Sequence, residues 1–479
     1  MVFSSLLFLF AFLAPQLILY FLVKKTKTRN IILLIFSLIF YAWGGPQYIL
    51  LILGESFVSW FTAREIGRYD MKKMKRRWLV LECVVLFGLL FFFKYTGFFF
   101  SNLKNIFGWP EVVPEIVLPI GISFYTFQLV SYVADVYRGE VKAQEKYWKV
   151  LLYCSLFHQC IAGPIVRYQT VADEIEERTV SAKDISEGIR RFTVGLAKKA
   201  ILANGCAAIA DTLPTTLEGA AGASTASLWI GAFAYMLQIY LDFSAYSDMA
   251  IGMGRMVGFH YLENFEYPYT ATSVQGFWRR WHISLSTFFR DYVYIPLGGN
   301  RKGMGRTILN MLVVWFLTGM WHGASWNYIL WGLYYFLFLV IERLFLGRIL
   351  DKNGISRFIG HVYTMFVVFF GWVIFKFTDL NVLGEVLKGL FGAGHAASSV
   401  ESGSLIVNNV FFLILSIIAC SMLGKKIREG WYRKAIRSRS AGMQNAAYFI
   451  DMLTPVVLLV LSVLALIGNS YNPFLYFQF

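Results

Sequence analysis

His322 lies between two long apolar runs, in the stretch TGMWHGASW at residues 318–326. A titratable side chain at the depth of a bilayer is costly, and by default it marks a functional site. Imidazole takes and returns protons near neutral pH, which suits a general base in transfer to a hydroxyl. The alternative is a hydrogen-bonded histidine that only packs within the helices. The position favours an enzyme over a passive membrane scaffold, with His322 as the candidate catalytic residue.

Polar groups close to His322 in the sequence could stabilise the oxyanion of an acyl-transfer intermediate. The candidate substrate-binding residues here are Trp321, Ser325, Trp326 and Asn327. No nearby carboxylate completes a Ser-His-Asp arrangement, and no HExxH motif occurs. The sequence therefore predicts neither a hydrolytic triad nor a zinc site, and we expect no metal ligands.

A second polar cluster, FWRRWHISLSTFFRDY, occupies residues 277–292. If this segment forms one helix, Trp278, His282, Ser286 and Phe289 share a face. Its guanidinium groups suit an anionic donor such as a phosphate-bearing coenzyme or an acidic carrier. The alternative is a lipid-surface helix with snorkelling arginines and an aromatic belt. The candidates are His282 as a second catalytic residue and, for substrate binding, Trp278, Arg279, Arg280, Trp281, Ser284, Ser286, Arg290 and Asp291.

Two carboxylates, Asp242 and Asp248, interrupt the apolar run QIYLDFSAYSD at residues 238–248. Carboxylates inside a membrane are normally paired or functional. Asp242 and the neighbouring Ser244 are candidate substrate-binding residues. The equally weighted alternative is a structural ion pair with one of three arginines, Arg255, Arg279 and Arg280.

The composition requires a lipid environment for these clusters. Of 479 residues, 57% are hydrophobic, 18% aromatic and only 15% charged. The net charge of +15 comes largely from short loops at residues 24–29, 72–77 and 425–439, as in cytoplasmic loops beside anionic lipids. We therefore expect a lipid bilayer as partner and no nucleic acid. None of the five cysteines forms a CxxC pair, which favours free thiols.

The basic loops, taken as cytoplasmic, order the apolar segments along the chain. The expected spans lie near residues 3–23, 31–44, 47–63, 78–100, 116–137, 190–210, 226–257, 307–320, 326–342, 358–377, 404–423 and 447–468. We expect the first span to be a retained helix rather than a signal peptide. The tail at residues 469–479 and the N-terminus should lie outside the cytoplasm.

Two further segments are too short or too charged to cross. Residues 151–166 have charged flanks that both look cytoplasmic, so this apolar segment should be re-entrant. Residues 260–306 should form interfacial helices. The predicted fold class is an all-α polytopic membrane protein of about 11–12 transmembrane helices, in one integral-membrane domain spanning residues 1–479, without internal repeats or a soluble domain.

Several ordered segments resemble the membrane-bound O-acyltransferase (MBOAT) family, in particular its alginate O-acetylase-like branch. They are residues 118–128, 162–168, 238–248, 263–265, 277–301, 318–326 and 331–343, together with the tail 474–479. The resemblance implies a catalytic core at residues 118–343 and C-terminal transmembrane helices at 344–479. Two departures from the family pattern are His158, where a proline is frequent, and Tyr335, where a histidine is frequent.

The resemblance also implies roles for both histidines. The position of His322 is catalytic and lies at the base of an external funnel, and that of His282 belongs to a polar site nearer the cytoplasm. A central acyl-transfer tunnel would connect the two sides. Members of this branch pass acetyl groups, with acetyl-CoA as the expected donor, toward extracellular polysaccharide. They often work with a secreted SGNH-type transferase. No tightly bound cofactor is expected, and the location implied is the plasma or inner membrane.

Two other functions compete with acetyl transfer. Within the same family, the chain could transfer D-alanine to teichoic acid from a small acyl carrier protein. In a different class, a proton-coupled transporter could use His322 and Asp242 as a relay. Transporters usually have paired halves with broken helices at corresponding positions, and the sequence contains no such pairing.

Overall fold

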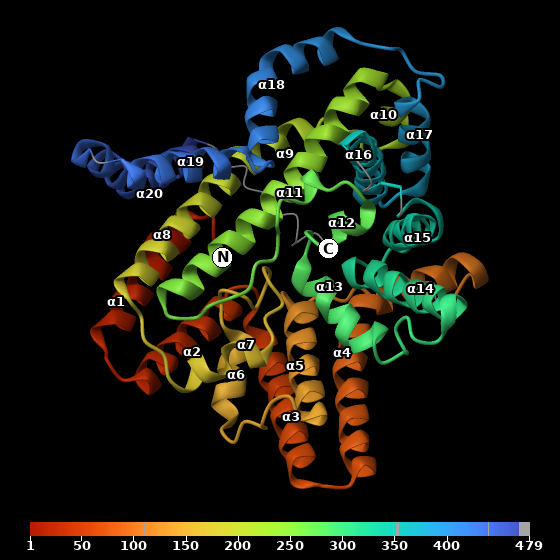
Figure 1. The fold of residues 1–479 in the computed structure, drawn as a ribbon. Coiled ribbons are helices and arrows are strands. Elements are labelled where there is room, and N and C mark those ends of the chain that lie inside the picture. Colours follow the sequence, from red (N-terminus) through yellow and green to blue (C-terminus); the bar gives the residue numbers. More distant parts are fainter. Residues whose placement is uncertain (110–111, 348, 351–353, 439, 469–479) are drawn as a thin grey trace. The chain divides into compact units, whose positions relative to one another are not determined.

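The described chain is helical, and its described residues contain no β-strand (Figure 1). The computed structural model describes residues 1–479 except 110–111, 348, 351–353, 439 and 469–479. The all-α prediction is therefore confirmed. The expected external tail at residues 469–479 lies outside the described residues.

Among the described residues, seven helices are long and apolar enough to cross a membrane. They are Lys72–Phe107 (α4), Ala182–Ala210 (α8, η3 and α9), Thr225–Met256 (α11), Trp326–Leu346 (α15 and η6), Gly354–Lys376 (α16), Val400–Ala419 (α18) and Ala441–Gly468 (α20). Each coincides with a predicted span, so the chain is a polytopic membrane protein. The prediction of 11–12 crossings additionally counts Ala14–Leu22 (α1), Thr26–Ala42 (α2), Ile49–Arg68 (α3), Ile122–Arg138 (α5) and Gly303–His322 (α14). That total stays a prediction.

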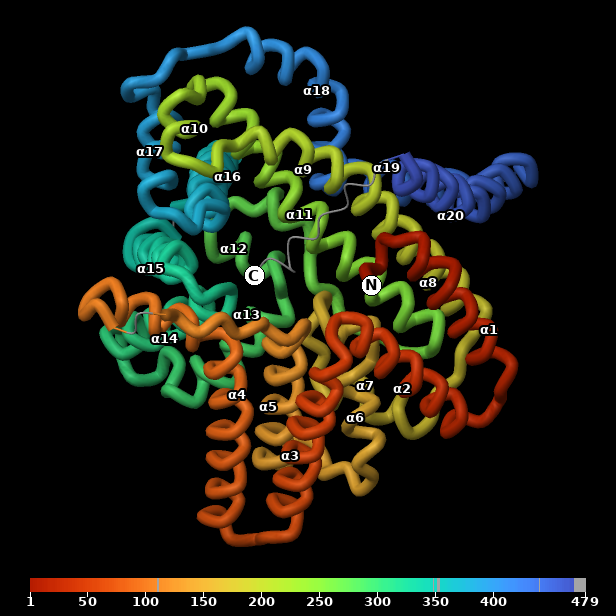
Figure 2. The backbone as a smooth tube through the Cα atoms, turned by 180° about the vertical axis from the view of Figure 1, so that it is seen from behind, coloured from red at the N-terminus to blue at the C-terminus, as the bar shows by residue number. Residues whose placement is uncertain are grey.

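The chain divides into two compact units, and the division falls inside α8, α11 and α13. The first unit comprises residues 1–192, 247–263 and 287–296. In it, α3, α4 and α5 run side by side (Figures 1 and 2). Buried polar groups bond across these helices, since Thr126 donates to Glu55 at 3.0 Å and Thr62 to Glu82 at 2.9 Å. Such bonds let polar side chains sit inside an apolar bundle.

The predicted re-entrant segment in this unit begins as a short helix, Tyr147–Ser155 (α6), and continues as buried irregular chain before Tyr168–Glu176 (α7). Protein groups satisfy part of its broken backbone. The amide of Phe157 donates to Ser37 Oγ at 3.1 Å, and the Tyr153 hydroxyl donates to the Val166 carbonyl at 2.8 Å. Protein groups thus satisfy part of the buried backbone, as a re-entrant segment requires. The membrane topology of the segment stays a prediction.

The second unit comprises residues 193–246, 264–286 and 297–479. Besides the helices already given, it contains Leu217–Gly222 (α10), Val274–Trp278 (α12), Leu380–Leu390 (α17) and Leu423–Arg437 (α19). Its core is rich in tryptophan and phenylalanine from α11, α12, α15 and α16. This unit contains both candidate catalytic histidines.

One expectation about residues 277–292 is wrong. The segment does not form one helix, because α12 ends at Trp278 and α13 begins at Ile283 and continues to Phe289. His282, in the break, has a φ of 44°, a left-handed conformation that few non-glycine residues adopt. Trp278, His282 and Ser286 therefore do not share a helical face.

Candidate functional site

His322 is the last residue of α14, and a tight helical hairpin with α15 holds it in place. Gly319 and Gly332 lie where the two helices approach most closely. A Cβ on Gly319 would clash with the Tyr328 carbonyl oxygen, and one on Gly332 would clash with that of Trp315. Small residues allow such close backbone approach between membrane helices. The hairpin thus fixes the height and direction of the His322 backbone.

Aromatic rings surround the His322 imidazole edge to face. Its ring centroid lies 5.0 Å from that of Trp321, 4.9 Å from Trp331 and 5.2 Å from Phe375. His322 retains 7% of its surface accessible, whereas His282 retains 1%. The imidazole is therefore in a largely water-excluded, aromatic environment, where electrostatic interactions with a reacting group are strong.

His282 is held by polar contacts with Asn264 and Ser284. The backbone N–H of Ser284 donates to Asn264 Oδ1 at 3.1 Å, and the Ser284 hydroxyl donates to it at 2.8 Å. These two donors identify the Asn264 side-chain atom at this position as the carbonyl oxygen. His282 Nδ1 lies 3.2 Å from the same oxygen and therefore donates to it. Among the described residues, Nε2 has no hydrogen-bond partner. Burial lowers the pKa of His282 to about 3, so the ring is neutral, with its lone pair on Nε2.

One indole connects the two histidines. The Trp321 ring centroid lies 5.7 Å from that of His282 and 5.0 Å from that of His322. Sequence separation gave no sign of this proximity, because 40 positions separate the two histidines. The structure thus brings the two candidate catalytic residues into one aromatic cluster of the second unit.

Trp331, which contacts His322, forms a cluster with Trp278 and Tyr335. Three buried polar atoms of this cluster have no hydrogen-bond partner among the described residues: Trp278 Nε1, Trp331 Nε1 and the Tyr335 hydroxyl. Their ring centroids lie 4.8–5.4 Å apart, and Trp331 also contacts His322. Gly371 makes room for this arrangement, because a Cβ there would clash with the Tyr335 hydroxyl. Buried donors without partners are rare and are expected to meet a ligand or water. This donor cluster can hold an oxygen atom of a substrate.

The four donors predicted near His322 have different surroundings. Trp321 is buried, Trp326 is 50% exposed, and Ser325 precedes α15 without a side-chain cap bond. Asn327 Nδ2 donates to the Phe375 carbonyl at 3.0 Å, so it ties α15 to α16. Tyr335 was not predicted as a donor. Its signal in the sequence was the departure from the family pattern.

The predicted partners of the buried aspartates are wrong. Asp242 pairs with Lys199 at 2.7 Å, and both side chains are at most 3% exposed. Asp248 pairs with Arg191 at 2.6 Å. Both partners are basic residues of the helical segment before α11, whereas the predicted partners were arginines later in the chain than the two aspartates. The structure supports the structural-tie alternative for both carboxylates, and Ser244 similarly accepts from Lys198 at 2.9 Å.

The remaining residues predicted to bind substrate are distributed over both units. In the second unit, Arg280 donates to Thr270 at 3.0 Å, the Ser286 hydroxyl donates to the Trp278 carbonyl at 3.4 Å, and Trp281 is buried against Trp372. Arg279 precedes the break at His282.

In the first unit, Asp291 accepts from Arg167 and from Arg290, each at 2.6 Å. Burial acts to raise the pKa of Asp291, but these two guanidinium groups outweigh it and lower the pKa. Asp291 is therefore an ionised structural partner at neutral pH, and the donor-binding role of Arg290 stays a prediction. Over the described part of the chain, no cluster of three acidic, histidine or cysteine residues could hold a metal ion.

Comparison with known proteins gives this geometry a chemical context. Residues 145–384 match MBOAT, the membrane-bound O-acyltransferase family. The chain belongs to the membrane-bound O-acyltransferase family. The predicted family and the predicted enzyme class, an O-acyltransferase, are therefore confirmed.

The relatives of this O-acyltransferase differ in the group named for transfer. Over its full length the chain is 39% identical to the whole of the probable alginate O-acetylase AlgI of Pseudomonas putida. It is 29% identical to the peptidoglycan O-acetyltransferase of Helicobacter pylori, over 100% of this chain and 98% of the relative. The teichoic acid D-alanyltransferase of Bacillus subtilis is 26% identical over 54% of this chain and 68% of its own length.

Asn264, which contacts the candidate residue His282 of this O-acyltransferase, was not among the predicted site residues. It appeared only within the matching segment at residues 263–265, as a residue of the family pattern. Its side chain is fully buried and accepts from both His282 and Ser284. A buried amide beside a histidine 18 positions later in sequence is a contact that only the fold reveals.

Proposed function

We propose that the chain transfers an acetyl group from a cytoplasmic thioester, acetyl-CoA, to a hydroxyl of an extracellular polysaccharide. Alternatively, the acetyl group passes first to a hydroxyl of a secreted SGNH-type transferase, which completes the transfer to the polysaccharide. The observation that supports this proposal is that the His322 ring contacts the Trp321 indole and also Trp331, which forms the donor cluster with Trp278 and Tyr335. A base and donors for an oxyanion are what acyl transfer to a hydroxyl requires.

In the proposed reaction, His322 accepts the proton of the acceptor hydroxyl as its oxygen attacks the thioester carbonyl carbon. The resulting oxyanion accepts hydrogen bonds from the donor cluster. The intermediate collapses by breaking the carbon–sulfur bond, and the thiolate leaves with the proton that His322 carried. One C–O bond forms and one C–S bond breaks, so the reaction needs no oxidant or reductant.

His282 has a different part in this proposal. Its neutral ring offers the Nε2 lone pair, which can accept a hydrogen bond from the donor or the acceptor but cannot stabilise negative charge. Its contact with Trp321 supports a role in holding the indole that it shares with His322. We therefore assign His282 to substrate orientation and His322 to proton transfer.

The share of the chain that each relative matches favours transfer of an acetyl group over transfer of a D-alanyl group. Relatives named as O-acetylases or O-acetyltransferases match the entire chain, whereas the D-alanyltransferase of Bacillus subtilis matches 54% of it. The basic loops favour a donor on the cytoplasmic side of the plasma or inner membrane, since such loops stay in the cytoplasm.

The test uses purified chain in proteoliposomes, radiolabelled acetyl-CoA and polysaccharide, with and without an extracellular protein fraction. Wild type should label polysaccharide or protein hydroxyls, and His322→Ala should lower the rate by at least ~10²-fold. Size-exclusion elution of the variant should match that of wild type.

A parallel reaction supplies D-alanyl-loaded carrier protein in place of acetyl-CoA. Transfer of D-alanine without transfer of acetyl would contradict the acetyl assignment. Wild-type rates in folded His322→Ala would contradict the role of His322.

A further inference from the structure

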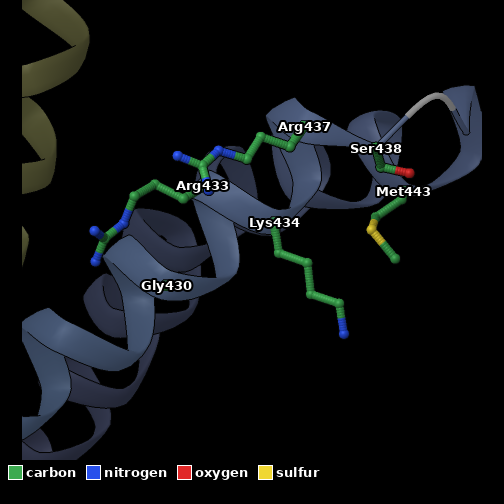
Figure 3. A pocket seen from close by; sticks show the side chains of 6 residues that line it. All are labelled: Gly430, Arg433, Lys434, Arg437, Ser438 and Met443. Atoms are coloured by element: carbon green, nitrogen blue, oxygen red, sulfur yellow. The ribbon is translucent and has the colours of Figure 1, made fainter.

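A basic cavity lies where α19 turns into α20, in a segment that the proposed reaction does not use. It has a volume of about 580 Å³ and is lined by Gly430, Arg433, Lys434, Arg437, Ser438 and Met443. Figure 3 shows these side chains along α19 and at the start of α20. The volume lies within the range typical of small-ligand sites, ~300–1,000 Å³.

The cavity follows from the pattern of residues along α19. Gly430, Arg433, Lys434 and Arg437 are spaced i, i+3, i+4 and i+7, so they share one helical face. Gly430 leaves that face open, because a Cβ there would meet nothing within 4 Å. Regular helix geometry therefore places three cations around one recess.

The cations of this recess are not neutralised. Within the described ranges of the chain, no carboxylate forms an ion pair with Arg433, Lys434 or Arg437, all of which are exposed. The nearby Asp451 of α20 instead pairs with Arg428 at 3.1 Å. Guanidinium and ammonium groups around a recess of this kind are suited to a phosphate-bearing anion.

The surroundings of the recess favour a lipid as the source of that phosphate. Only 6% of the most apolar stretch of α20 is buried within the protein, so this helix presents its side chains to lipid. Leu423 and Ile427 of α19 lie two turns before Gly430 and Lys434, so they border the basic face, and together with Trp431 they are 38–62% exposed. A helix with an apolar stripe and a basic face lies in the membrane interface. The recess therefore opens at headgroup level.

We propose that the α19–α20 recess binds the headgroup phosphate of an anionic membrane phospholipid. The two arginines and Lys434 contact the phosphate, and Met443 and the apolar surface of α20 contact the start of the acyl chains. This site is independent of the acyl-transfer site.

The test titrates dihexanoyl phosphatidylglycerol into the full chain in neutral detergent by isothermal calorimetry. Dihexanoyl phosphatidylcholine serves as the neutral-headgroup reference, because its tails are identical. Each cation near an anionic lipid contributes roughly fivefold in affinity, so R433Q/K434Q/R437Q should weaken phosphatidylglycerol binding on the order of a hundredfold.

The matched control is K73Q/R76Q/R77Q, which also removes one lysine and two arginines, all exposed, at the start of α4. It should bind phosphatidylglycerol with an affinity within about threefold of wild type. The reason is that it removes the same positive charge at a place outside the recess. Gly430→Trp fills the recess without changing charge, so it should also weaken binding. Its effect separates occupation of the recess from general attraction to the basic helix.

A third titration uses inorganic phosphate alone. Equal phosphatidylglycerol affinity in R433Q/K434Q/R437Q and in wild type would overturn the proposal. So would affinity for inorganic phosphate that depends on these three residues while phosphatidylglycerol does not bind, because the ligand would then be a soluble anion.

Discussion

The regions around His282 and His322 hold the same side chain by different means. His282 lies in a break between two short helices, in a left-handed conformation, with Nδ1 bonded to Asn264. His322 ends a long helix and is surrounded by aromatic rings, with more of its surface accessible. Polar contacts hold the first ring, and aromatic rings pack around the second.

In the proposed reaction the two rings have different tasks. A ring whose proton is committed to Nδ1 serves well as a fixed hydrogen-bond acceptor. A general base must be able to gain and lose a proton during each reaction cycle, so it needs an environment that does not lock one form. The shared contact with Trp321 makes the two rings parts of one site.

Replacing each histidine by glutamine should give the largest difference in acetyl-transfer rate between the two sites. His322→Gln removes the base and should lower the acetyl-transfer rate by ~10²–10⁴-fold. His282→Gln retains polar atoms that can replace part of the hydrogen bonding, so its loss should be about tenfold. Rates come from the radiolabel assay in proteoliposomes. Equal losses in the two variants would contradict the division of labour.

The second test moves His322 without changing it. Gly332→Ala places a Cβ against the Trp315 carbonyl, so α14 and α15 must separate. Overpacking of this kind costs about 1–3 kcal/mol, and a shift of ~1 Å at a reacting group costs about 10²-fold in rate.

Gly305→Ala is the control in α14, since its Cβ meets nothing within 4 Å. It should leave the rate unchanged and the melting temperature equal or higher. Full activity in Gly332→Ala would show that the close hairpin is not needed to position His322.

Substitution of Asn264 releases the His282 ring together with Ser284. Asn264→Ala removes the acceptor of His282 Nδ1 and of Ser284, and it should destabilise the protein by about 1–3 kcal/mol. Because the ring can then protonate either nitrogen, we expect a rate loss of about tenfold and a changed pH–rate profile. Ser284→Ala keeps the Asn264 acceptor but removes a hydroxyl that lies 3.3 Å from His282 Nδ1, so its pH–rate profile should lie closer to wild type than that of Asn264→Ala. An unchanged profile in Asn264→Ala would refute the positioning role.

Two adjacent tyrosines, Tyr334 and Tyr335, allow a test of whether the donor cluster stabilises the oxyanion. The Tyr335 hydroxyl has no partner within the described ranges, whereas Tyr334 donates to the Val367 carbonyl at 2.9 Å. Tyr335→Phe should preserve stability and lower kcat about tenfold, because it removes one oxyanion donor. Tyr334→Phe should cost about 1 kcal/mol of stability and leave kcat unchanged. Thermal unfolding and kcat measured on both variants decide the point, and the reverse pattern would contradict it.

The sequence predicted the long helices because runs of apolar residues between basic loops determine them almost alone. α11 and α15 begin and end within one residue of the predicted spans 226–257 and 326–342. It could not predict the partners of Asp242 and Asp248, because pairing depends on which helices become neighbours.

The break at His282 was equally hidden. Residues 279–282 contain neither glycine nor proline, so no local signal opposed a continuous helix. The side chain of Asn264, 18 positions away, accepts from His282 Nδ1 within the break and from the Ser284 amide at the start of α13, so these contacts lie outside the local sequence. His322 was identifiable from the sequence because its apolar flanks isolate it, but its neighbours Trp331 and Phe375 come from other helices.

His260 in the first unit is a reference histidine, and its substitution should have the smallest effect, a pH-dependent change in melting temperature. Its Nδ1 lies 2.7 Å from Glu174, and Nε2 lies 3.5 Å from Asp184. Burial acts to lower the pKa of His260, but hydrogen bonds and charges from both carboxylates outweigh it and raise the pKa. The protonated form is therefore stabilised by folding, fully so below the unfolded pKa of about 6.5. This contribution is lost as pH rises through the folded pKa.

Wild type should therefore melt above His260→Gln at pH 5.5, and the difference should shrink to near zero once the pH exceeds the raised pKa. Because the side chain is half exposed, we expect the difference to be only a few degrees or less. His282→Gln, measured in the same series, should show the opposite trend, because the folded ring has a pKa of about 3 and stays neutral while the unfolded ring protonates below about 6.5. Wild type should therefore lose about 1.4 kcal/mol of stability relative to this variant as the pH falls from 8 to 5.5. A difference for His282 that does not vary over this pH range would mean that the folded ring protonates near its unfolded pKa, which would contradict its assignment as a neutral hydrogen-bond acceptor.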